Sequence, residues 1–271
     1  MNPYQPMMDL ALLLAREAGQ TISSLRSQLN IEFKHDDTEL VTQADVAADK
    51  LISDGIRKAF EQHDILSEEL APDANTDCEH LWIIDPIDGT VNYAHGHAQV
   101  AISIAYFFKG DCKVAVVHNP FARETFTAMA GRGAFLNGEP IQVSGKLALN
   151  RALVATGFPY QKDTIDKLMK RATAVLKNCA DIRRIGSAAL DICWVACGRL
   201  DAYYESVQPW DAAAAGLIAR EAGATLGHLY SVPVEENPQI FSQDIVVTTP
   251  ALFDQLKALL LQADDSSLAD D

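Results

Sequence analysis

The sequence WIIDPIDGT, residues 82–90, carries the strongest indication of how this chain folds and what it does. An apolar run typical of a buried strand leads directly into two carboxylates, Asp85 and Asp88. Pro86 has no N–H for a sheet ladder, so we expect the strand to stop there and both carboxylates to bend toward one point. Two aspartates with a carbonyl between them suit Mg²⁺, whereas the soft ligands of a zinc site are missing from this segment. The segment therefore predicts a strand that leads into a site for a hard cation.

The residues after Asp88 fit close contact with a ligand. Gly89 lets the backbone approach closely, and Thr90 offers a hydroxyl and a backbone amide at the start of the next element. The run Asp-Pro-x-Asp-Gly is equally typical of a surface turn, because these residues favour turns. Taken alone, the segment does not separate a cation site from a turn.

Two further acidic segments favour the cation site. Ile65–Glu69 is again a short apolar strand that ends in carboxylates, Glu68 and Glu69. Asp211 lies directly before an alanine-rich helix, where it could also act as an N-cap. Three acidic ends of strands or helices, each preceded by apolar residues, together predict one shared cation site.

The flanking sequence predicts helices on one side of this segment and a sheet on the other. The spacing of apolar residues indicates an amphipathic helix over 7–25 and a second helix after Thr42, an N-cap with Asp45 in the capping-box position. A first-turn acid is thus the simple interpretation of Asp45. Residues 81–130 alternate β-rich runs with turns, which is typical of an antiparallel sheet.

The chain divides into two predicted halves without a sharp linker. Residues 1–150 form an N-terminal α+β half with most of the candidate ligands. In residues 151–262 strands and helices alternate, so we expect a C-terminal α/β half in which helices cover a sheet and which carries Asp211. Residues 263–271 are polar and acidic, and we expect them to form a disordered tail.

Composition excludes several classes of protein. The 271 residues include 37 Asp and Glu against 22 Lys and Arg, which gives a net charge of −15, and 48% are hydrophobic, which is enough for a core. The acidity disfavours broad basic patches for nucleic acids or anionic membranes. Five cysteines without framework spacing, no signal-peptide pattern and no long apolar run predict a cytoplasmic protein that does not span a membrane.

Several motifs together resemble the inositol monophosphatase family of Mg²⁺-dependent, lithium-sensitive phosphomonoesterases. They are the glutamate pair 68–69, LVTQAD at 40–45, WIIDPIDGTVN at 82–92, RIGSAALDICWVACGRLDAYYE at 184–205 and WDAAAAGLIAREAG at 210–223. The resemblance covers nearly the whole chain, and bacterial members are the most similar in overall wording. It implies an α/β layered fold, the alternating αβαβα sandwich of the sugar phosphatases that includes fructose-1,6-bisphosphatase. It also implies a homodimer, inhibition by Li⁺ and two or three Mg²⁺ ions.

The resemblance assigns roles to individual residues. One Mg²⁺ would be held by Glu68, Asp85 and the Ile87 carbonyl, a second by Asp85, Asp88 and Asp211, and a weaker third would involve Glu68. Thr90, paired with Asp45, would orient or deprotonate the attacking water. Substrate contacts would come from Asp88, Gly89, Thr90, Gly186, Ser187, Ala188, Glu205 and Asp211, of which Gly89 and Thr90 would hold phosphate through their amides. Lys34 stands where the family has a mobile-loop lysine near the metals, but it is equally consistent with a solvated side chain.

The implied reaction is direct in-line attack of water on a phosphate monoester, with no phosphoenzyme. Haloacid dehalogenase phosphatases also contain Asp-Gly-Thr, preceded two residues earlier by a nucleophilic aspartate. Here the residue two before Asp88 is Pro86, which disfavours a covalent aspartyl phosphate.

The residues after the signature favour one substrate within the family. Val91-Asn92-Tyr93 resembles the Thr-Asn-Phe of inositol-phosphate hydrolysis, and the Glu205 carboxylate can accept hydrogen bonds from ring hydroxyls. We therefore predict myo-inositol 1-phosphate, with related polyol phosphates, 2′-AMP or NADP as secondary substrates. Fructose 1,6-bisphosphate, histidinol phosphate and adenosine 3′,5′-bisphosphate remain alternatives within the family. A regulatory partner of the transcription machinery is the alternative from a different class.

Overall fold

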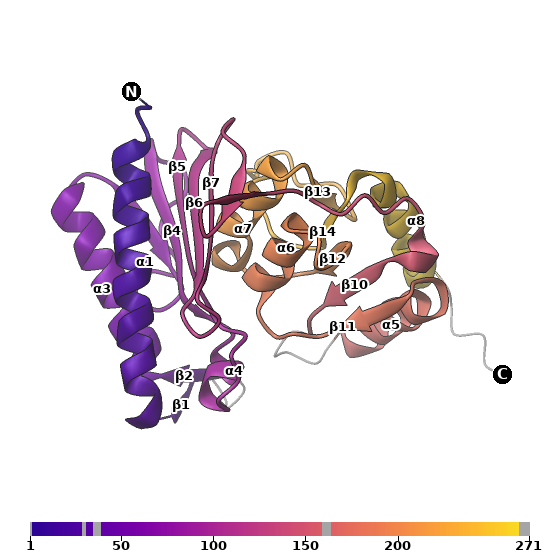
Figure 1. Ribbon diagram of the computed structural model, residues 1–271, viewed down its shortest axis with the longest axis horizontal. Coiled ribbons are helices and arrows are strands. Elements are labelled where there is room, and N and C mark those ends of the chain that lie inside the picture. The colour runs from indigo at the N-terminus through magenta and orange to yellow at the C-terminus, as the bar shows by residue number, and fades with distance from the viewer. Residues whose placement is uncertain (1, 29–30, 35–38, 159–163, 266–271) are drawn as a thin grey trace.

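The structure of this protein is a computed structural model that describes residues 2–28, 31–34, 39–158 and 164–265. Its elements form five layers in the order helix, sheet, helix, sheet, helix along the long axis of the molecule (Figure 1). This arrangement confirms the αβαβα sandwich that the family resemblance implies. None of the described helices combines the length and the apolar character that crossing a membrane requires.

The first sheet has seven strands, and helices α1 (Gln5–Leu25) and α3 (Gln43–Ala59) cover its outer face (Figure 1). The strand order is β3-β4-β5-β6-β7-β8-β9, and all neighbours are antiparallel except the parallel pair β3 and β4. The strands are β3 (Asp64–Ser67), β4 (His80–Asp88), β5 (Ala101–Phe108), β6 (Asp111–Asn119), β7 (Glu124–Met129), β8 (Ala134–Leu136) and β9 (Glu139–Ile141). The antiparallel sheet expected for residues 81–130 is confirmed. A small hairpin of β1 (Ile31–Lys34) and β2 (Glu39–Thr42), which the sequence does not predict, precedes α3.

The second sheet has five strands in the order β11-β10-β12-β14-β13. The strands are β10 (Leu153–Thr156), β11 (Asp181–Arg183), β12 (Ala202–Glu205), β13 (Thr225–His228) and β14 (Ile245–Thr248). Helices α6 (Ala188–Ala196) and α7 (Pro209–Glu221) lie between the two sheets, and α5 (Ile165–Asn178) and α8 (Phe253–Asp265) cover the outer face (Figure 1). Described strands of the first sheet precede residue 150 and those of the second follow it. The division into halves at that point stays a prediction, since α6 and α7 from the second half pack on the first sheet.

Both faces of the first sheet are buried, and β4 shows why its sequence is continuously apolar. Leu81 and Ile83 pack in the core that contains α6 and α7, whereas Trp82 and Ile84 pack in the core that contains α1 and α3. Because side chains alternate along a strand, a sheet covered on both sides needs apolar residues at every position. After its partly exposed first residue, the strand is therefore buried along its whole length up to Asp85 and Asp88, where the carboxylates lie.

Strand β4 does not stop at Pro86, as the sequence predicts, but continues to Asp88 through a bulge. Its register against β5 shifts by one residue between Asp85 and Asp88. In a regular strand these two residues, three positions apart, would point to opposite faces. The extra residue moves Asp88 to the same face as Asp85, while Ile87 joins the core beneath α1 and α3. The bulge is thus the local feature that brings the two carboxylates together.

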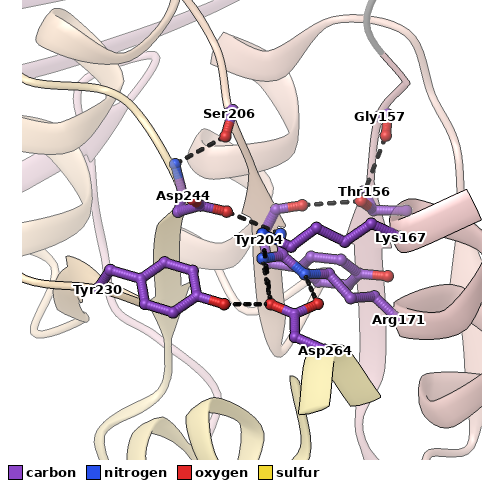
Figure 2. A network of polar contacts seen from close by, with 9 residues as sticks. All are labelled: Thr156, Gly157, Lys167, Arg171, Tyr204, Ser206, Tyr230, Asp244 and Asp264. Atoms are coloured by element: carbon purple, nitrogen blue, oxygen red, sulfur yellow. Dashed lines mark hydrogen bonds and ion pairs between the residues drawn. The ribbon is translucent and has the colours of Figure 1, made fainter. Parts of the chain in front are cut away.

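The predicted tail begins too early, because residues 263–265 belong to helix α8. Asp264 accepts two hydrogen bonds from the buried guanidinium of Arg171 on α5, at 2.8 and 2.7 Å, and one from the Tyr230 hydroxyl at 2.6 Å (Figure 2). Arg171 also donates to Asp244 at 2.8 Å. Charge-assisted bonds of this kind fix the last turn of α8 to α5 and to the residues next to β13 and β14. The rest of the predicted tail lies outside the described residues.

Candidate active site

Three aspartates meet at the end of the first sheet that faces α6 and α7. One carboxylate oxygen from each of Asp85, Asp88 and Asp211 lies within 4.8 Å of the others. Asp85 and Asp88 come from the bulge of β4 and are buried, and Asp211 comes from the first turn of α7 and is partly buried. The structure thus brings together residues separated by more than a hundred positions in the sequence. A cluster of this kind can hold a hard cation.

The start of α7 explains how Asp211 reaches the other two aspartates. Helix α7 begins at Pro209, three residues earlier than the sequence predicts, so Asp211 lies inside the first turn and is not the N-cap. The N-cap is Gln208, whose backbone N–H donates to the Asp211 carboxylate at 2.8 Å. The hydroxyl of Ser103 on β5 donates to the Trp210 carbonyl at 3.0 Å. This bond ties the first turn of α7 to the strand that flanks the bulge.

Asp88 is held by the beginning of helix α6. Its carboxylate accepts hydrogen bonds from the Ser187 hydroxyl at 2.5 Å and from the backbone N–H groups of Ala189 at 2.8 Å and Ala188 at 3.2 Å. A helix N-terminus favours a negative charge, so these contacts stabilise the ionised form of Asp88. They also place Ser187 and Ala188, two predicted substrate contacts, directly beside the cluster. Gly186 precedes them with φ +87°, a conformation that favours glycine.

Burial and mutual repulsion disfavour ionisation of the carboxyl groups in the cluster. Burial, together with the charges of Glu68 and Asp211, raises the pKa of Asp85 well above its ordinary value. Burial and the charge of Asp88 raise the pKa of Asp211 to about 8. Burial also raises the pKa of Asp88, but only to about 6, because Ser187 and the amides of α6 oppose it. Ionisation of the whole cluster at neutral pH therefore calls for a counter-charge, which a divalent cation would supply.

Thr90 and Asp45 form a hydrogen-bonded pair next to this cluster. The Thr90 hydroxyl lies 3.1 Å from the Asp45 carboxylate and 3.1 Å from the Ile87 carbonyl, so it can donate to either. Asp45 is fully buried, and its other oxygen accepts from the Thr42 hydroxyl at 2.6 Å and the Thr42 N–H at 2.7 Å. The predicted capping box is therefore confirmed, and the same carboxylate also serves Thr90. Burial raises the pKa of Asp45, and the bonds from Thr42 and Thr90 oppose that rise.

Glu68 belongs to the same end of the sheet. It follows β3, which runs parallel to β4, so both strands reach this edge in the same direction. Its backbone N–H donates to the Ile84 carbonyl at 3.3 Å, and its charge contributes to the raised pKa of Asp85. Lys34 lies at the end of β1, but its side chain is outside the described residues.

Glu205 from the second half and two glycines, one from each half, also shape the site. The Tyr203 hydroxyl donates to Glu205 at 2.6 Å, and burial raises the pKa of Glu205 to about 7. A Cβ at Gly157 would lie 2.1 Å from the Glu205 carboxylate, so only glycine leaves room for this side chain. Gly89 has φ +95°, and a Cβ there would lie 2.9 Å from the Gln99 carbonyl and 3.0 Å from that of Gly186. Both close approaches explain why glycine stands at these positions.

Sequence reasoning missed three residues that shape the site. The Asn92 side chain donates to the carbonyls of Gln99 and Ile185, both at 2.8 Å, and so joins the loop after α4 (Thr90–Ala94) to the start of α6. The Arg184 guanidinium lowers the pKa values of both Asp88 and Glu205 against the effect of burial. Both lie inside motifs quoted above, but nothing local in the sequence shows their partners. The third, Asp49, is treated below.

Without divalent cations, we expect the free energy of unfolding to fall as the pH rises from about 6 to about 8. Burial raises the pKa of Asp88 to about 6, and burial together with the charge of Asp88 raises the pKa of Asp211 to about 8, which defines this window. A carboxyl whose pKa is raised in the folded state keeps its proton there after the unfolded chain has lost it, so its ionisation in this window disfavours folding. Mg²⁺ should therefore raise the melting temperature more at pH 8 than at pH 6. Thermal unfolding in EDTA and in Mg²⁺ measures this.

The Asp211→Asn protein is the control for that measurement. It lacks the group whose pKa is raised to about 8, so its stability in EDTA should depend less on pH in this window. An equal effect of Mg²⁺ at both pH values, or a stability in EDTA that increases with pH, would contradict the prediction.

Comparison with known proteins gives one consistent family. The model of the inositol monophosphatase family matches residues 4–263. The proteins named Nus factor SuhB from Pasteurella multocida and from Escherichia coli K12 are each 38% identical, over 93% of this chain and 99% of the relative. Among solved structures, an IMPase from Thermotoga maritima has a TM-score of 0.85 at 32% identity, covering 96% of this chain and 98% of its own. An inositol monophosphatase from Anabaena (Nostoc) sp. PCC 7120 has a TM-score of 0.81 at 34% identity, and the match covers 95% of this chain and 96% of that structure.

Proposed function

The chain belongs to the inositol monophosphatase family, and from that premise we propose that it is a Mg²⁺-dependent phosphatase that hydrolyses myo-inositol 1-phosphate to inositol and phosphate. The observation that carries the proposal is the buried cluster of Asp85, Asp88 and Asp211 beside the Thr90–Asp45 pair. This arrangement offers oxygen ligands for hard cations and a hydroxyl held by a carboxylate. Both are what the hydrolysis of a phosphate ester requires.

The donor set fits Mg²⁺ better than a softer ion. We propose that Glu68, Asp85 and the Ile87 carbonyl hold one ion, that Asp85, Asp88 and Asp211 hold a second, and that Glu68 contributes to a weaker third. One oxygen of Asp88 accepts from both Ser187 and Ala189, but the other accepts only from the Ala188 N–H and keeps a second lone pair for a cation. When bound, the ions would neutralise charge on the phosphoryl oxygens and lower the pKa of water.

The residues of the chain would orient the attacking water and receive its proton. When the Thr90 hydroxyl donates to Asp45, its oxygen lone pairs are available to accept a hydrogen bond from water. The water would thereby be aimed at phosphorus, and its proton would pass by way of Thr90 to the Asp45 carboxylate. The amides of Gly89 and Thr90 would hold the phosphate, so that the attack occurs in line with the leaving oxygen.

Glu205 supports a polyol as the group released. Its carboxylate is held by Tyr203 and can accept hydrogen bonds from ring hydroxyls, while Gly186, Ser187 and Ala188 would form the opposite wall. A substrate without such hydroxyls would leave unpaired the lone pairs of this partly buried carboxylate that Tyr203 does not use. Because unpaired polar groups are costly, the site should discriminate against that substrate.

We expect kcat/KM for myo-inositol 1-phosphate to exceed that for adenosine 3′,5′-bisphosphate by about tenfold or more, since a site built to bind several ring hydroxyls disfavours a ligand that offers only the 2′-hydroxyl of its ribose. Glu205→Ala should raise KM for inositol 1-phosphate but not for p-nitrophenyl phosphate, which has no ring hydroxyls. A phosphate-release panel with and without Mg²⁺ and Li⁺ measures both effects, and it includes 2′-AMP, NADP, fructose 1,6-bisphosphate and histidinol phosphate. A tenfold preference for the bisphosphate nucleotide would overturn the substrate assignment.

The names of the relatives favour a second candidate function. Relatives 38% identical to this chain are called Nus factor SuhB, so we also propose a regulatory role alongside the transcription machinery. This role and hydrolysis are compatible within one chain, and variants without turnover separate them. We further propose that the protein is a cytoplasmic homodimer inhibited by Li⁺, which light scattering and inhibition assays would test.

A further inference from the structure

Asp49 is a buried carboxylate that no part of the proposed mechanism uses. It lies on α3, one helical turn after Asp45, and is fully buried. One of its oxygens accepts hydrogen bonds from the backbone N–H groups of Glu69 and Leu70, both at 3.1 Å. The other accepts from the Ser53 hydroxyl at 2.9 Å. Asp49 is thus bound to the turn that follows strand β3.

This turn is the one that presents Glu68 to the aspartate cluster. At its base, Ser67 and Ala71 exchange two backbone hydrogen bonds of 3.2 and 3.3 Å, and the Glu68 N–H donates to Ile84 on β4 at 3.3 Å. The tip, formed by Glu69 and Leu70, is partly exposed to solvent. The contact from Asp49 therefore fixes the part of the turn that lies furthest from the sheet ladder.

We propose that Asp49 is a positioning residue that holds the Glu68 carboxylate against the Asp85–Asp88–Asp211 cluster by fixing the backbone of the turn after β3. This inference rests on the proposed function, because it gives Glu68 the role of a cation ligand. A glutamate side chain has several rotatable bonds, so a mobile backbone beneath it would spread its carboxylate over many positions. Ligands held by outer partners bind a cation more tightly than ligands that must be ordered on binding.

The placement of Asp49 gives α3 a double role in the site. Residues four apart lie on the same face of a helix, so Asp45 and Asp49 project in the same direction. Asp45 holds the Thr90 hydroxyl, and Asp49 holds the turn of Glu68. One rigid helix would therefore set the distance between the group that orients water and one of the cation ligands.

The test is the affinity of the whole protein for Mn²⁺, which replaces Mg²⁺ in the measurement because both ions prefer carboxylate oxygens. Free Mn²⁺ is measured by electron paramagnetic resonance. Asp49→Ala should weaken binding about tenfold, the usual effect of removing an outer partner of a ligand. Asp49→Asn keeps a carbonyl oxygen that can accept both amides, so it should stay within about threefold of the unaltered protein.

A double-mutant cycle tests whether Asp49 acts through Glu68. In the Glu68→Gln background the ligand is already impaired, so adding Asp49→Ala should weaken Mn²⁺ binding by less than about twofold more. Ile56→Val is the matched control, because Ile56 is buried on the same helix about two turns after Asp49 and does not contact the turn through a hydrogen bond of its side chain. It should lower stability without changing Mn²⁺ affinity.

The outcomes distinguish a failure of the positioning role of Asp49 from a failure of the proposed phosphatase function. Unaltered affinity in Asp49→Ala, or an equal loss in both backgrounds, would overturn the positioning role and leave the proposed function standing. A tenfold loss in Asp49→Asn would show that charge, not hydrogen bonding, is what Asp49 supplies, and would also overturn it. Failure of the unaltered protein to bind Mn²⁺ would overturn the proposed function first and this inference with it.

Discussion

The Asp88→Asn protein is expected to fold normally and to lose at least about 1000-fold in kcat at saturating Mg²⁺. The substitution removes a carboxylate from the cluster in which any bound cation would share oxygens of Asp85 and Asp211. Stabilisation of transition-state charge by a cation contributes several kcal/mol, and about 4 kcal/mol corresponds to a factor of roughly 1000 in rate. Phosphate release under steady-state conditions measures the loss.

The fold of Asp88→Asn should survive because asparagine keeps most of the contacts. Its carbonyl oxygen can still accept from the Ser187 hydroxyl and the Ala189 N–H. Its amide nitrogen would face the Ala188 N–H, at a cost of about 1–2 kcal/mol for the unfavourable contact. Removal of one charge from a repulsive cluster offsets part of that cost. We therefore expect only a small change in the free energy of unfolding.

Asp201→Asn is the matched control for this prediction. Asp201 is also a buried aspartate, and it accepts hydrogen bonds from the Leu153 N–H at 2.8 Å and from the Ser144 hydroxyl. It precedes β12 at the end opposite Glu205, away from the cluster. The Asp201→Asn protein should be less stable than the unaltered protein but should have the same kcat. If Asp88→Asn retained most of its turnover at saturating Mg²⁺, the assignment of the cation site would be wrong.

The same variant separates the two candidate functions in cells. An Asp88→Asn protein that folds but does not turn over can still present its surface to a partner. If it fully restores the phenotype of a deletion strain, the interaction is the important role of this protein. If it does not restore the phenotype although it accumulates normally, hydrolysis is required.

The elements around the site could be predicted from the sequence because neighbouring residues specify them. The apolar run at 81–84 indicates β4, and Thr42 with Asp45 indicates the start of α3, each from residues within four positions of one another. The α/β layering followed from the motifs that resemble the family. Local patterns of this kind are independent of the rest of the fold, so a single sequence reveals them.

The geometry of the carboxylates could not be predicted, because it depends on distant partners. Asp88 is held by Ser187 and Ala189, 99 and 101 residues away, and it reaches them only through a bulge in β4. The same holds for Asp264, whose partner Arg171 is 93 residues away and turns an apparent tail into a helix end. No periodicity in one sequence encodes such pairings, since the fold brings them together.

Asp45 illustrates a different limit of sequence reasoning. Its position in a capping box suggests a purely structural residue, and its place in the family motif suggests a role in catalysis. The structure supports both contacts at once, because one oxygen accepts from Thr42 and the other from Thr90. A local explanation for a residue therefore does not exclude a second contact on the other side of the same carboxylate.

The Thr90→Val protein is expected to lose about 100- to 1000-fold in kcat, the usual contribution of a positioned acid or base. Valine has nearly the shape of threonine, so the buried position should stay filled while the hydroxyl that faces Asp45 is removed. Binding of Mn²⁺ should not change, because Thr90 is not assigned as a cation ligand. Steady-state kinetics and Mn²⁺ titration of the same sample measure both quantities.

Asp45→Asn should produce a similar loss, and the double variant should be little worse than either single one. Residues that act as a unit in proton transfer lose their whole contribution when either is removed, so their effects do not add. Thr42→Ala is the matched control: it removes another hydroxyl bonded to Asp45 and costs about 1 kcal/mol of stability as a lost cap. It leaves the contact between Thr90 and Asp45 in place, so kcat should stay within a fewfold of the unaltered enzyme. A Thr90→Val protein with nearly full turnover would show that the aspartate cluster orients water without help from this pair.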